Sequence, residues 1–312
     1  MPNHLRKPIA EFCGTFILVL FGCGVVHTAT LYDAQVGLGQ IALVWGLAVM
    51  FGIYVCGAVS GGHLNPAMTL AFAVHHQMPW KEVIPYWVGQ FSGAFCAAAV
   101  LYVLFAPSIV EIEKEKGLEP KSILSARCYG EYYSSPHAAA DTLDAEGNVV
   151  TKADWRNNRD WEKKSPMYVA FLGEAIGTFF LAFIVFALID PRNGARPTGP
   201  LTPVFVGLTI AMLISIFAPL TQAGFNPARD FSPRLFAFLA GWGETAIPGP
   251  NGHGFWIVYI VAPCVGSVLG GLCYNNTVRR GLPVPEACSS THASLCPECD
   301  KALRVFLSPR EE

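Results

Sequence analysis

Six apolar segments, each long enough to cross a lipid bilayer and almost free of charge, constrain this chain more than any other feature. A helix of about 20 apolar residues crosses the roughly 30 Å hydrocarbon layer of a membrane. The alternative is a large soluble protein with six buried helices, which the near absence of charge in these segments disfavours. We therefore predict an all-α, multi-pass membrane protein. The segments are residues 9–31, 38–59, 83–106, 167–189, 200–218 and 254–275.

The composition agrees with this interpretation. Of the 312 residues, 52 % are hydrophobic and only 14 % are charged, and the mean hydropathy is +0.39. Soluble chains carry about 25 % charged residues, so much of the surface of this protein is not expected to face water. Nine of the 21 Lys and Arg residues and eleven of the 23 Asp and Glu residues lie between Ser108 and Ser165. The formal net charge of −2 does not indicate a nucleic-acid partner.

Lys and Arg residues in short loops predict the orientation of the chain, because they gather on the cytoplasmic side of a membrane. When six spans are threaded, these residues fall on one side, whereas the turn near Asp33 on the other side has none. We therefore expect both termini in the cytoplasm and the 108–165 segment outside. The apolar run after Lys7 is longer than the roughly 7–15 residues of a signal-peptide core, so we interpret it as a retained span rather than a cleaved signal. The basic residues concerned are Arg6, Lys7, Lys81, Arg192, Arg196, Arg279 and Arg280.

The chain repeats itself. The pattern E-x-x-G-T-F occurs at 11–16 and at 174–179, and each copy is followed by Asn-Pro-Ala, at 65–67 and at 226–228. The intervals agree closely, since 65 − 11 = 54 and 226 − 174 = 52. Three spans per copy is an odd number, so the second copy must enter the membrane from the opposite side, which is an inverted-topology repeat with a shared site near the midplane.

Two further apolar pieces are too short to span. A helix of about ten residues is roughly 15 Å long, half the hydrocarbon thickness. The pieces Pro66–Val74 and Pro227–Leu239 each follow an Asn-Pro pair, where Asn is a favoured N-cap and Pro a favoured first residue. We predict two re-entrant half-helices that meet end to end in mid-membrane.

The motifs Ser60–Ala67 (SGGHLNPA) and Gly224–Asp230 (GFNPARD) resemble the signature of the aquaporin, or major intrinsic protein, superfamily. The resemblance covers about residues 8 to 280. Asp230 directly after Arg229, with Arg234 four residues later, is similar to the glycerol-facilitator (aquaglyceroporin) branch, and Pro263-Cys264 agrees. The expected organisation is a channel domain over 1–280, made of repeat one (8–106), an extracellular loop (107–166) and repeat two (167–280), followed by a cytoplasmic tail over 281–312.

The resemblance implies a pore with a defined set of lining residues. The Asn-Pro-Ala residues Asn65, Pro66, Ala67, Asn226, Pro227 and Ala228 are expected at its centre, with the asparagine amides donating into the pore. Non-helical backbone at membrane depth must line a polar path. The carbonyls expected to form a ladder of acceptors along one wall belong to Gly61, Gly62, His63, Leu64, Gln222, Ala223 and Gly224.

A selectivity filter is expected from matched spacing. Trp45 lies 20 residues before Asn65, and Ile214 and Ala223 lie 12 and three residues before Asn226. The resemblance implies Trp, Gly and Phe at these positions and Arg229 as the fourth member, so only Trp45 and Arg229 match. A water-only channel usually has His at the second position. Trp, Ile and Arg should still admit a carbon backbone more easily than a Phe–His–Arg filter.

Other charged residues of the membrane region are assigned to support, because ionisable groups are costly there. Glu11 and Glu174 are expected to accept backbone N–H bonds from the re-entrant loops, and Asp230 is likewise assigned to loop support. His63 is interpreted as a loop-packing residue rather than a metal ligand, since no other ligand is near it in sequence. Both glycine pairs, Gly89-x-x-x-Gly93 and Gly266-x-x-x-Gly270, are interpreted as internal helix contacts rather than a subunit interface.

The C-terminal tail holds Cys288, His292, Cys296 and Cys299, four zinc-type ligands in twelve residues. The spacing is not that of a standard finger, so we favour an uncoordinated tail over a structural zinc site, and no other cofactor is expected.

Taken together, these features predict a passive channel for glycerol-type polyols and water that excludes ions and protons, in a plasma or inner membrane. The resemblance implies a homotetramer in the bilayer. The alternatives are a water-selective aquaporin, a secondary transporter built on inverted repeats, and a non-transporting membrane adhesion protein. No catalytic dyad, nucleotide loop or cofactor motif stands out, so an enzyme is not expected.

Overall fold

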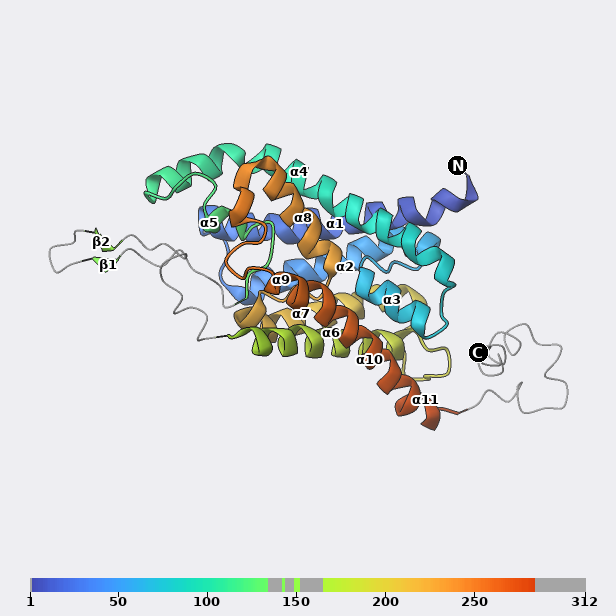
Figure 1. The fold of residues 1–312 in the computed structure, drawn as a ribbon. Coiled ribbons are helices and arrows are strands. Elements are labelled where there is room, and N and C mark those ends of the chain that lie inside the picture. Colours follow the sequence, from blue (N-terminus) through green and yellow to red (C-terminus); the bar gives the residue numbers. More distant parts are fainter. Residues whose placement is uncertain (1, 134–141, 144–148, 152–164, 284–312) are drawn as a thin grey trace, which may run out of the picture.

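The computed structural model describes residues 2–133, 142–143, 149–151 and 165–283. Within this part of the chain, six helices are long and apolar enough to cross a membrane, which confirms the predicted spans of an all-α fold. They run side by side along the molecule, with the N-terminus and the last helix, α11, at one end and the short helix α5 at the other (Figure 1). The spans are His4–Tyr32, Leu38–Ser60, Trp80–Glu115, Met167–Ile189, Gly199–Thr221 and Gly254–Gly281.

The elements follow the order of the repeat. The first half comprises α1 (Asn3–Tyr32), α2 (Leu38–Ser60), α3 (Pro66–Val74), the 3₁₀ turn η1 (Trp80–Glu82) and α4 (Val83–Glu115). The connection contains α5 (Ile123–Ala126) and an antiparallel pair of short strands, β1 (Thr142–Leu143) and β2 (Val149–Thr151). The second half begins with α6 (Met167–Ile189), η3 (Gly199–Leu201), α7 (Thr202–Thr221) and α8 (Pro227–Ala237). It ends with η4 (Phe238–Trp242), η5 (Gly243–Thr245), α9 (Gly254–Trp256), η6 (Ile257–Val261), α10 (Ala262–Asn276) and α11 (Val278–Gly281).

Several helices are longer than the apolar segments that revealed them. Helix α4 continues to Glu115, so the connection begins nine residues later than the predicted boundary at 106 (115 − 106 = 9). Helix α1 begins at Asn3 instead of residue 9, and the last span reaches Gly281 instead of residue 275. Hydropathy marks only the part of a helix that is apolar, whereas charged helix formers such as Glu and Lys extend it further. Conversely, α8 stops at Ala237, two residues before the predicted end, where a π turn follows.

Glycines set the close crossings of the bundle. A Cβ on Gly93 of α4 would collide with the carbonyl oxygen of Phe12 on α1, and one on Gly270 of α10 would collide with that of Phe179 on α6. Both predicted glycine pairs therefore pack within this chain, as interpreted from sequence. In the same way, Gly46 of α2 and Gly207 of α7 each face the other's carbonyl oxygen, which joins the two halves at matching points.

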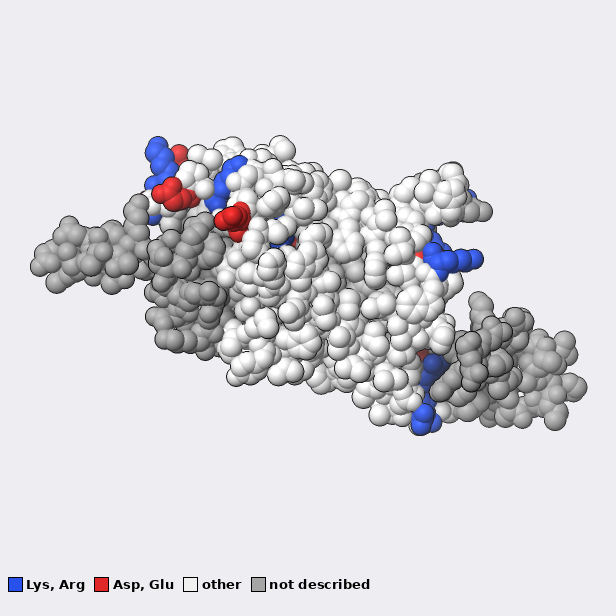
Figure 2. Space-filling view, viewed as in Figure 1, with Lys and Arg blue, Asp and Glu red and all other residues white. Residues whose placement is uncertain are grey.

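Charged side chains are segregated along the molecule. On the face shown in Figure 2, Lys, Arg, Asp and Glu gather near the two ends, and the broad band between them carries almost none. Large apolar side chains of the spans, such as Phe51, Val103 and Ile216, are more than half exposed. A surface of this kind matches a lipid environment rather than water.

Candidate functional site

The two short helices α3 and α8 begin at the Asn-Pro pairs and meet N-terminus to N-terminus. The Asn65 side chain accepts the Ala67 N–H (2.9 Å), and the Asn226 side chain accepts the Ala228 N–H (3.0 Å), so each asparagine caps its own helix. Each amide also donates across the junction: Asn65 Nδ2 to the Phe225 carbonyl and Asn226 Nδ2 to the Leu64 carbonyl, both at 2.8 Å. One amide hydrogen of each asparagine thus holds the partner loop, and the second remains for a solute.

The chain before each asparagine is not helical. Leu64, Gln222, Ala223 and Phe225 all have left-handed φ values between 53° and 66°. Such conformations cost free energy for non-glycine residues and persist only where their surroundings hold them. They turn successive carbonyl groups out of any helical hydrogen-bonding pattern.

One buried carboxylate holds each of these loops. Glu11 accepts the backbone N–H groups of His63 (2.9 Å) and Leu64 (2.8 Å). Glu174 accepts those of Gly224 (2.9 Å) and Phe225 (2.6 Å). Both glutamates are fully buried, and the structure places them in the supporting position expected from sequence.

Glu11 belongs to a wider polar network. Its carboxylate also accepts hydrogen bonds from Ser60 Oγ (2.6 Å) and Gln90 Nε2 (2.8 Å), and Gln90 reaches Thr69 Oγ1 as well (2.9 Å). His63 contacts Thr69 through Nδ1 (3.1 Å), and its ring packs against aromatic side chains, in keeping with a packing role. Sequence reasoning missed Gln90, although a lone glutamine in a charge-free span was a usable signal.

Two cavities adjoin each other inside the protein. The larger, about 380 Å³, is lined by Asn65, Asn226 and the loop segments 61–64 and 223–225, and its far end reaches the Lys7–Glu82 salt bridge (2.7 Å). The smaller, about 250 Å³, is lined by Gln222 together with residues of α1, α2, α7 and the segment before residue 133. Trp45, Ile214 and Arg229 line both cavities, so they mark the boundary between the two.

This boundary contains the predicted filter residues. The guanidinium carbon of Arg229 lies 4.0 Å from the centre of the Trp45 ring, in cation–π contact. Ile214 and Ala223 are likewise buried, and Ala223 lines the larger cavity beside them. Among the residues predicted to form the carbonyl ladder, Gln222 alone does not line the larger cavity; it lines the smaller one.

The walls of the larger cavity differ in chemistry. Its lining includes the backbone of the two loops and aliphatic side chains such as Val49, Val185 and Val206. The carbonyl oxygens of five loop residues accept no hydrogen bond from any other residue that the structure describes, and so remain available as acceptors. These residues are Gly61, Gly62, His63, Ala223 and Gly224.

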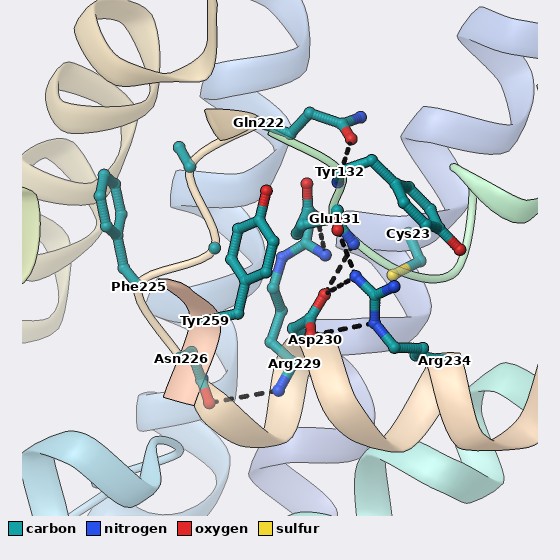
Figure 3. Close-up of polar contacts among 12 residues, drawn as sticks. Cys23, Glu131, Tyr132, Gln222, Phe225, Asn226, Arg229, Asp230, Arg234 and Tyr259 are labelled. Carbon is teal, nitrogen blue, oxygen red and sulfur yellow. Dashed lines mark hydrogen bonds and ion pairs between the residues drawn. The ribbon is translucent and has the colours of Figure 1, made fainter. Parts of the chain in front are cut away.

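An acidic side chain that sequence analysis did not select also reaches the boundary. Glu131, from the segment after α5, forms an ion pair with Arg229, and both side chains are buried (Figure 3). Beside them, Arg234 is fully buried and pairs with Asp230 (Nη2 to Oδ1, 2.8 Å). The Asp230 carboxylate also accepts the Glu131 backbone N–H (2.7 Å), so the loop that Asp230 supports is the one carrying Glu131.

Comparison with known proteins decides the family. The family model for major intrinsic proteins matches residues 1–274. The chain belongs to the major intrinsic protein family. The glycerol uptake facilitator protein of Escherichia coli (strain K12) is 36 % identical over 277 residues, which cover 88 % of this chain and 89 % of that relative. The propanediol uptake facilitator PduF of Salmonella typhimurium is 34 % identical over 274 residues, covering 88 % and 94 %.

A solved structure shows the same fold. The aquaglyceroporin from Plasmodium falciparum superimposes on this major intrinsic protein with a TM-score of 0.71 and 24 % sequence identity, covering 88 % of this chain and 97 % of that one. At this identity the likeness bears on the fold.

One predicted site of this major intrinsic protein is not reached by the structure. Cys288, His292, Cys296 and Cys299, the zinc-type residues of the tail, lie outside the described residues. Among the residues that are described, no cluster of three or more His, Cys, Asp or Glu side chains is arranged to hold a metal ion.

Proposed function

We propose that this protein is a passive channel for glycerol-type polyols and water, driven by the gradient of the solute. The observation that carries the proposal is the mixed lining of the larger cavity, which combines free carbonyl acceptors of the two loops with aliphatic side chains. A polyol has hydroxyl groups along one edge and C–H groups along the other, so it can exchange its hydration shell for matched contacts. The names of the glycerol and propanediol uptake facilitators support this class of solute.

The filter fits a solute with a carbon backbone. Arg229 offers guanidinium donors to a hydroxyl oxygen, and the Trp45 ring offers a flat apolar face to C–H groups. Ala223 leaves open the corner where the glycerol-type pattern has an aromatic ring, while Ile214 adds bulk where that pattern has glycine. The two departures act in opposite directions on the width of the filter.

We infer that the junction of α3 and α8 excludes ions and protons. The N-termini of α3 and α8 direct the positive ends of two helix dipoles at the junction, which is unfavourable for cations. The asparagine amides interrupt a chain of waters by donating to the water that passes between them, so a proton cannot move along the file.

The setting of the channel follows from the family and the charge pattern. We propose that α3 and α8 re-enter the membrane from opposite sides, that both termini face the cytoplasm of a plasma or inner membrane, and that the chains assemble as homotetramers. Basic residues of short loops support the orientation.

Stopped-flow light scattering on proteoliposomes tests the proposal. Fast shrinkage in an impermeant osmolyte followed by fast, non-saturating reswelling in glycerol is the expected result. Shrinkage without reswelling would identify a water-selective channel instead, and saturable flux coupled to an ion gradient would identify a transporter.

A substitution at the filter sharpens the test. Ala223→Phe should restore an aromatic corner and change the glycerol-to-water permeability ratio. Phe225 adopts a similar φ (53° against 60°), so an aromatic residue is compatible with this backbone. Ile216→Phe, on the exposed face of α7, is the control, because it adds an aromatic ring to the same region without reaching a cavity. An unchanged ratio in Ala223→Phe would remove that position from the constriction.

A further inference from the structure

We propose that this protein binds the phosphate headgroup of an anionic lipid at the end of the molecule where the turn after α6 meets α11. Arginines of these two segments form the site, beside an apolar stripe of α10 that an acyl chain can follow. None of these arginines lines either cavity. The inference therefore depends on the membrane setting of the chain and not on which solute it passes.

A single buried acid brings the two arginine-bearing segments together. Asp190 follows the last residue of α6 and is only 5 % exposed. Its Oδ1 accepts the Arg192 N–H (2.9 Å), and its Oδ2 accepts the Tyr274 hydroxyl (3.1 Å). The same Oδ2 pairs with Arg279 Nε (3.2 Å). The Arg192 guanidinium in turn donates to the Arg279 carbonyl oxygen, so the turn and α11 form one structure.

The turn after α6 is held by its own side chains. Asn193 Nδ2 donates to the Ala187 carbonyl (2.9 Å), and Asn193 Oδ1 accepts the Ala195 N–H (3.1 Å). Arg196 Nη1 lies 3.4 Å from the Ile189 carbonyl oxygen, at the end of α6. The two arginines of this turn are therefore carried by a fixed backbone, which keeps their positive charges close to the end of the span.

The cluster carries an excess of positive charge and unused donors. Residues 190–198 and 277–283 contain four arginines and one acid, which leaves three net positive charges (4 − 1 = 3). Of the four, Arg279 alone forms an ion pair within the part of the chain that the structure describes. Arg192 Nε is shielded from solvent and has no hydrogen-bond acceptor among the described residues. Guanidinium groups match the oxygens of a phosphate in geometry and charge. The four are Arg192, Arg196, Arg279 and Arg280.

An apolar stripe of α10 leads to this cluster. Val265, Leu269 and Leu272 are 40 %, 49 % and 48 % exposed, and their spacing of four and three residues places them on one face of the helix. The same face continues to Asn276, whose Oδ1 accepts Arg280 Nη2 (2.7 Å). Figure 2 shows basic side chains where α11 lies, next to the band that carries almost no charge. An acyl chain on the stripe therefore places its headgroup at the arginines.

This combination of charge and apolar surface selects an anionic lipid. Basic pockets at the ends of membrane helices bind anionic headgroups, and each Lys or Arg near the surface strengthens the attraction about fivefold. A zwitterionic lipid has a cation of its own, which offsets the attraction of its phosphate. A soluble phosphate meets the same arginines but gains nothing from Leu269 and Leu272.

The experiment titrates the full chain in detergent with dioleoyl phosphatidylglycerol, counts bound lipid by native mass spectrometry and records the melting temperature. Binding should saturate at one lipid per chain, and the melting temperature should rise by about 3–6 °C at ten times the dissociation constant. Dioleoyl phosphatidylcholine and inorganic phosphate should give neither effect. Equal binding of phosphatidylcholine would overturn the proposal, and an equal rise with inorganic phosphate would identify a soluble anion as the ligand instead.

Two matched double variants test the position of the site. Arg192→Gln with Arg280→Gln removes two charges but keeps the pair of Asp190 with Arg279, and should weaken phosphatidylglycerol binding about thirtyfold. Arg6→Gln with Lys81→Gln removes two charges from exposed residues outside the cluster, and should bind as the unchanged protein does. Equal weakening in both would reduce the effect to net charge and overturn the proposal.

A third variant tests the apolar stripe without changing any charge. Leu269→Gln places a polar group in the middle of the stripe, so it should weaken phosphatidylglycerol binding while all four arginines stay in place. Since the side chain is half exposed, its replacement should leave the melting temperature without lipid unchanged. Binding equal to that of the unchanged protein would show that no acyl chain lies on the stripe and would refute this part of the site.

Discussion

The carboxylates that hold the loops before α3 and α8 give a quantitative prediction for both halves of the protein. Glu174 uses one oxygen for the Gly224 N–H and the other for the Phe225 N–H. Glu174→Gln replaces one acceptor oxygen by an NH₂ group, so one buried backbone N–H loses its partner and faces a second donor. An unsatisfied buried donor costs about 1–3 kcal/mol. The free energy of unfolding should fall by about that amount.

The same substitution in the first half should have a similar cost. Each oxygen of Glu11 accepts one backbone N–H and one side-chain donor. The side-chain donors have alternatives, since Ser60 Oγ lies 3.3 Å from the Cys56 carbonyl and Gln90 Nε2 already reaches Thr69. Glu11→Gln therefore also leaves one backbone N–H without a partner, and again costs about 1–3 kcal/mol.

Thermal unfolding in detergent measures both costs. At a few °C per kcal/mol for a chain of this size, both variants should melt roughly 3–10 °C lower than the unchanged protein. Glu244→Gln, an exposed acid, should stay within about 0.5 kcal/mol of it. If either buried variant melts at the same temperature as the exposed control, its carboxylate does not hold the loop. The supporting role of that glutamate would then be refuted for that half of the protein.

Three further predictions follow from the pore and the helix crossings. Ile214→Phe should lower glycerol flux more than water flux by narrowing the boundary between the cavities, whereas Ile216→Phe on the exposed face of α7 should change neither in the same swelling assay. Asn226→Asp should raise cation leak, measured as conductance in planar bilayers, because it places a negative charge at the junction of the half-helices; conductance at the background level would contradict this. Gly93→Ala should lower the melting temperature because its Cβ would collide with the α1 backbone, whereas Gly24→Ala, whose Cβ would lie 3.5 Å from its nearest neighbour, should be tolerated; equal melting of the two variants would argue against the crossing.

The spans and the central junction could be predicted because their signals are local and repeated. A charge-free apolar stretch specifies a membrane helix whatever its neighbours are, and the boundaries of α3 at Pro66 and Val74 follow from the Asn-Pro cap and the length of the apolar run. Two Asn-Pro caps at nearly equal sequence intervals from matching Glu residues, 54 and 52 residues, indicate a paired structure. The two hydrogen bonds across the junction, from each asparagine amide to the opposite loop carbonyl, could not be predicted. They depend on the distance between the two helices, which no sequence pattern indicates.

Glu131 could not be selected from sequence for a physical reason. The segment from Ser108 to Ser165 contains eleven acidic residues, and charged surface loops contain many such residues without any contact to a pore. What distinguishes Glu131 is the pair of acceptors, Asp230 and Gln222, that lie far away in sequence and hold its backbone. Asp230 accepts the Glu131 N–H, and a carboxylate in a sequence does not indicate which N–H it will accept.

The internal repeat shows what the two halves of the pore share and where they differ. The two halves share their framework: Tyr86 donates to the Ser60 carbonyl (2.6 Å) as Tyr259 donates to that of Thr221 (2.8 Å), and a glutamate holds each loop. The two halves differ at the positions that line the boundary between the cavities. Three residues after the first Asn-Pro-Ala asparagine stands Met68, and three after the second stands Arg229. The ion pair of that arginine with the connecting segment places a buried charged pair at the boundary between the cavities, and the first half has no counterpart of this arginine at the matching position, Met68.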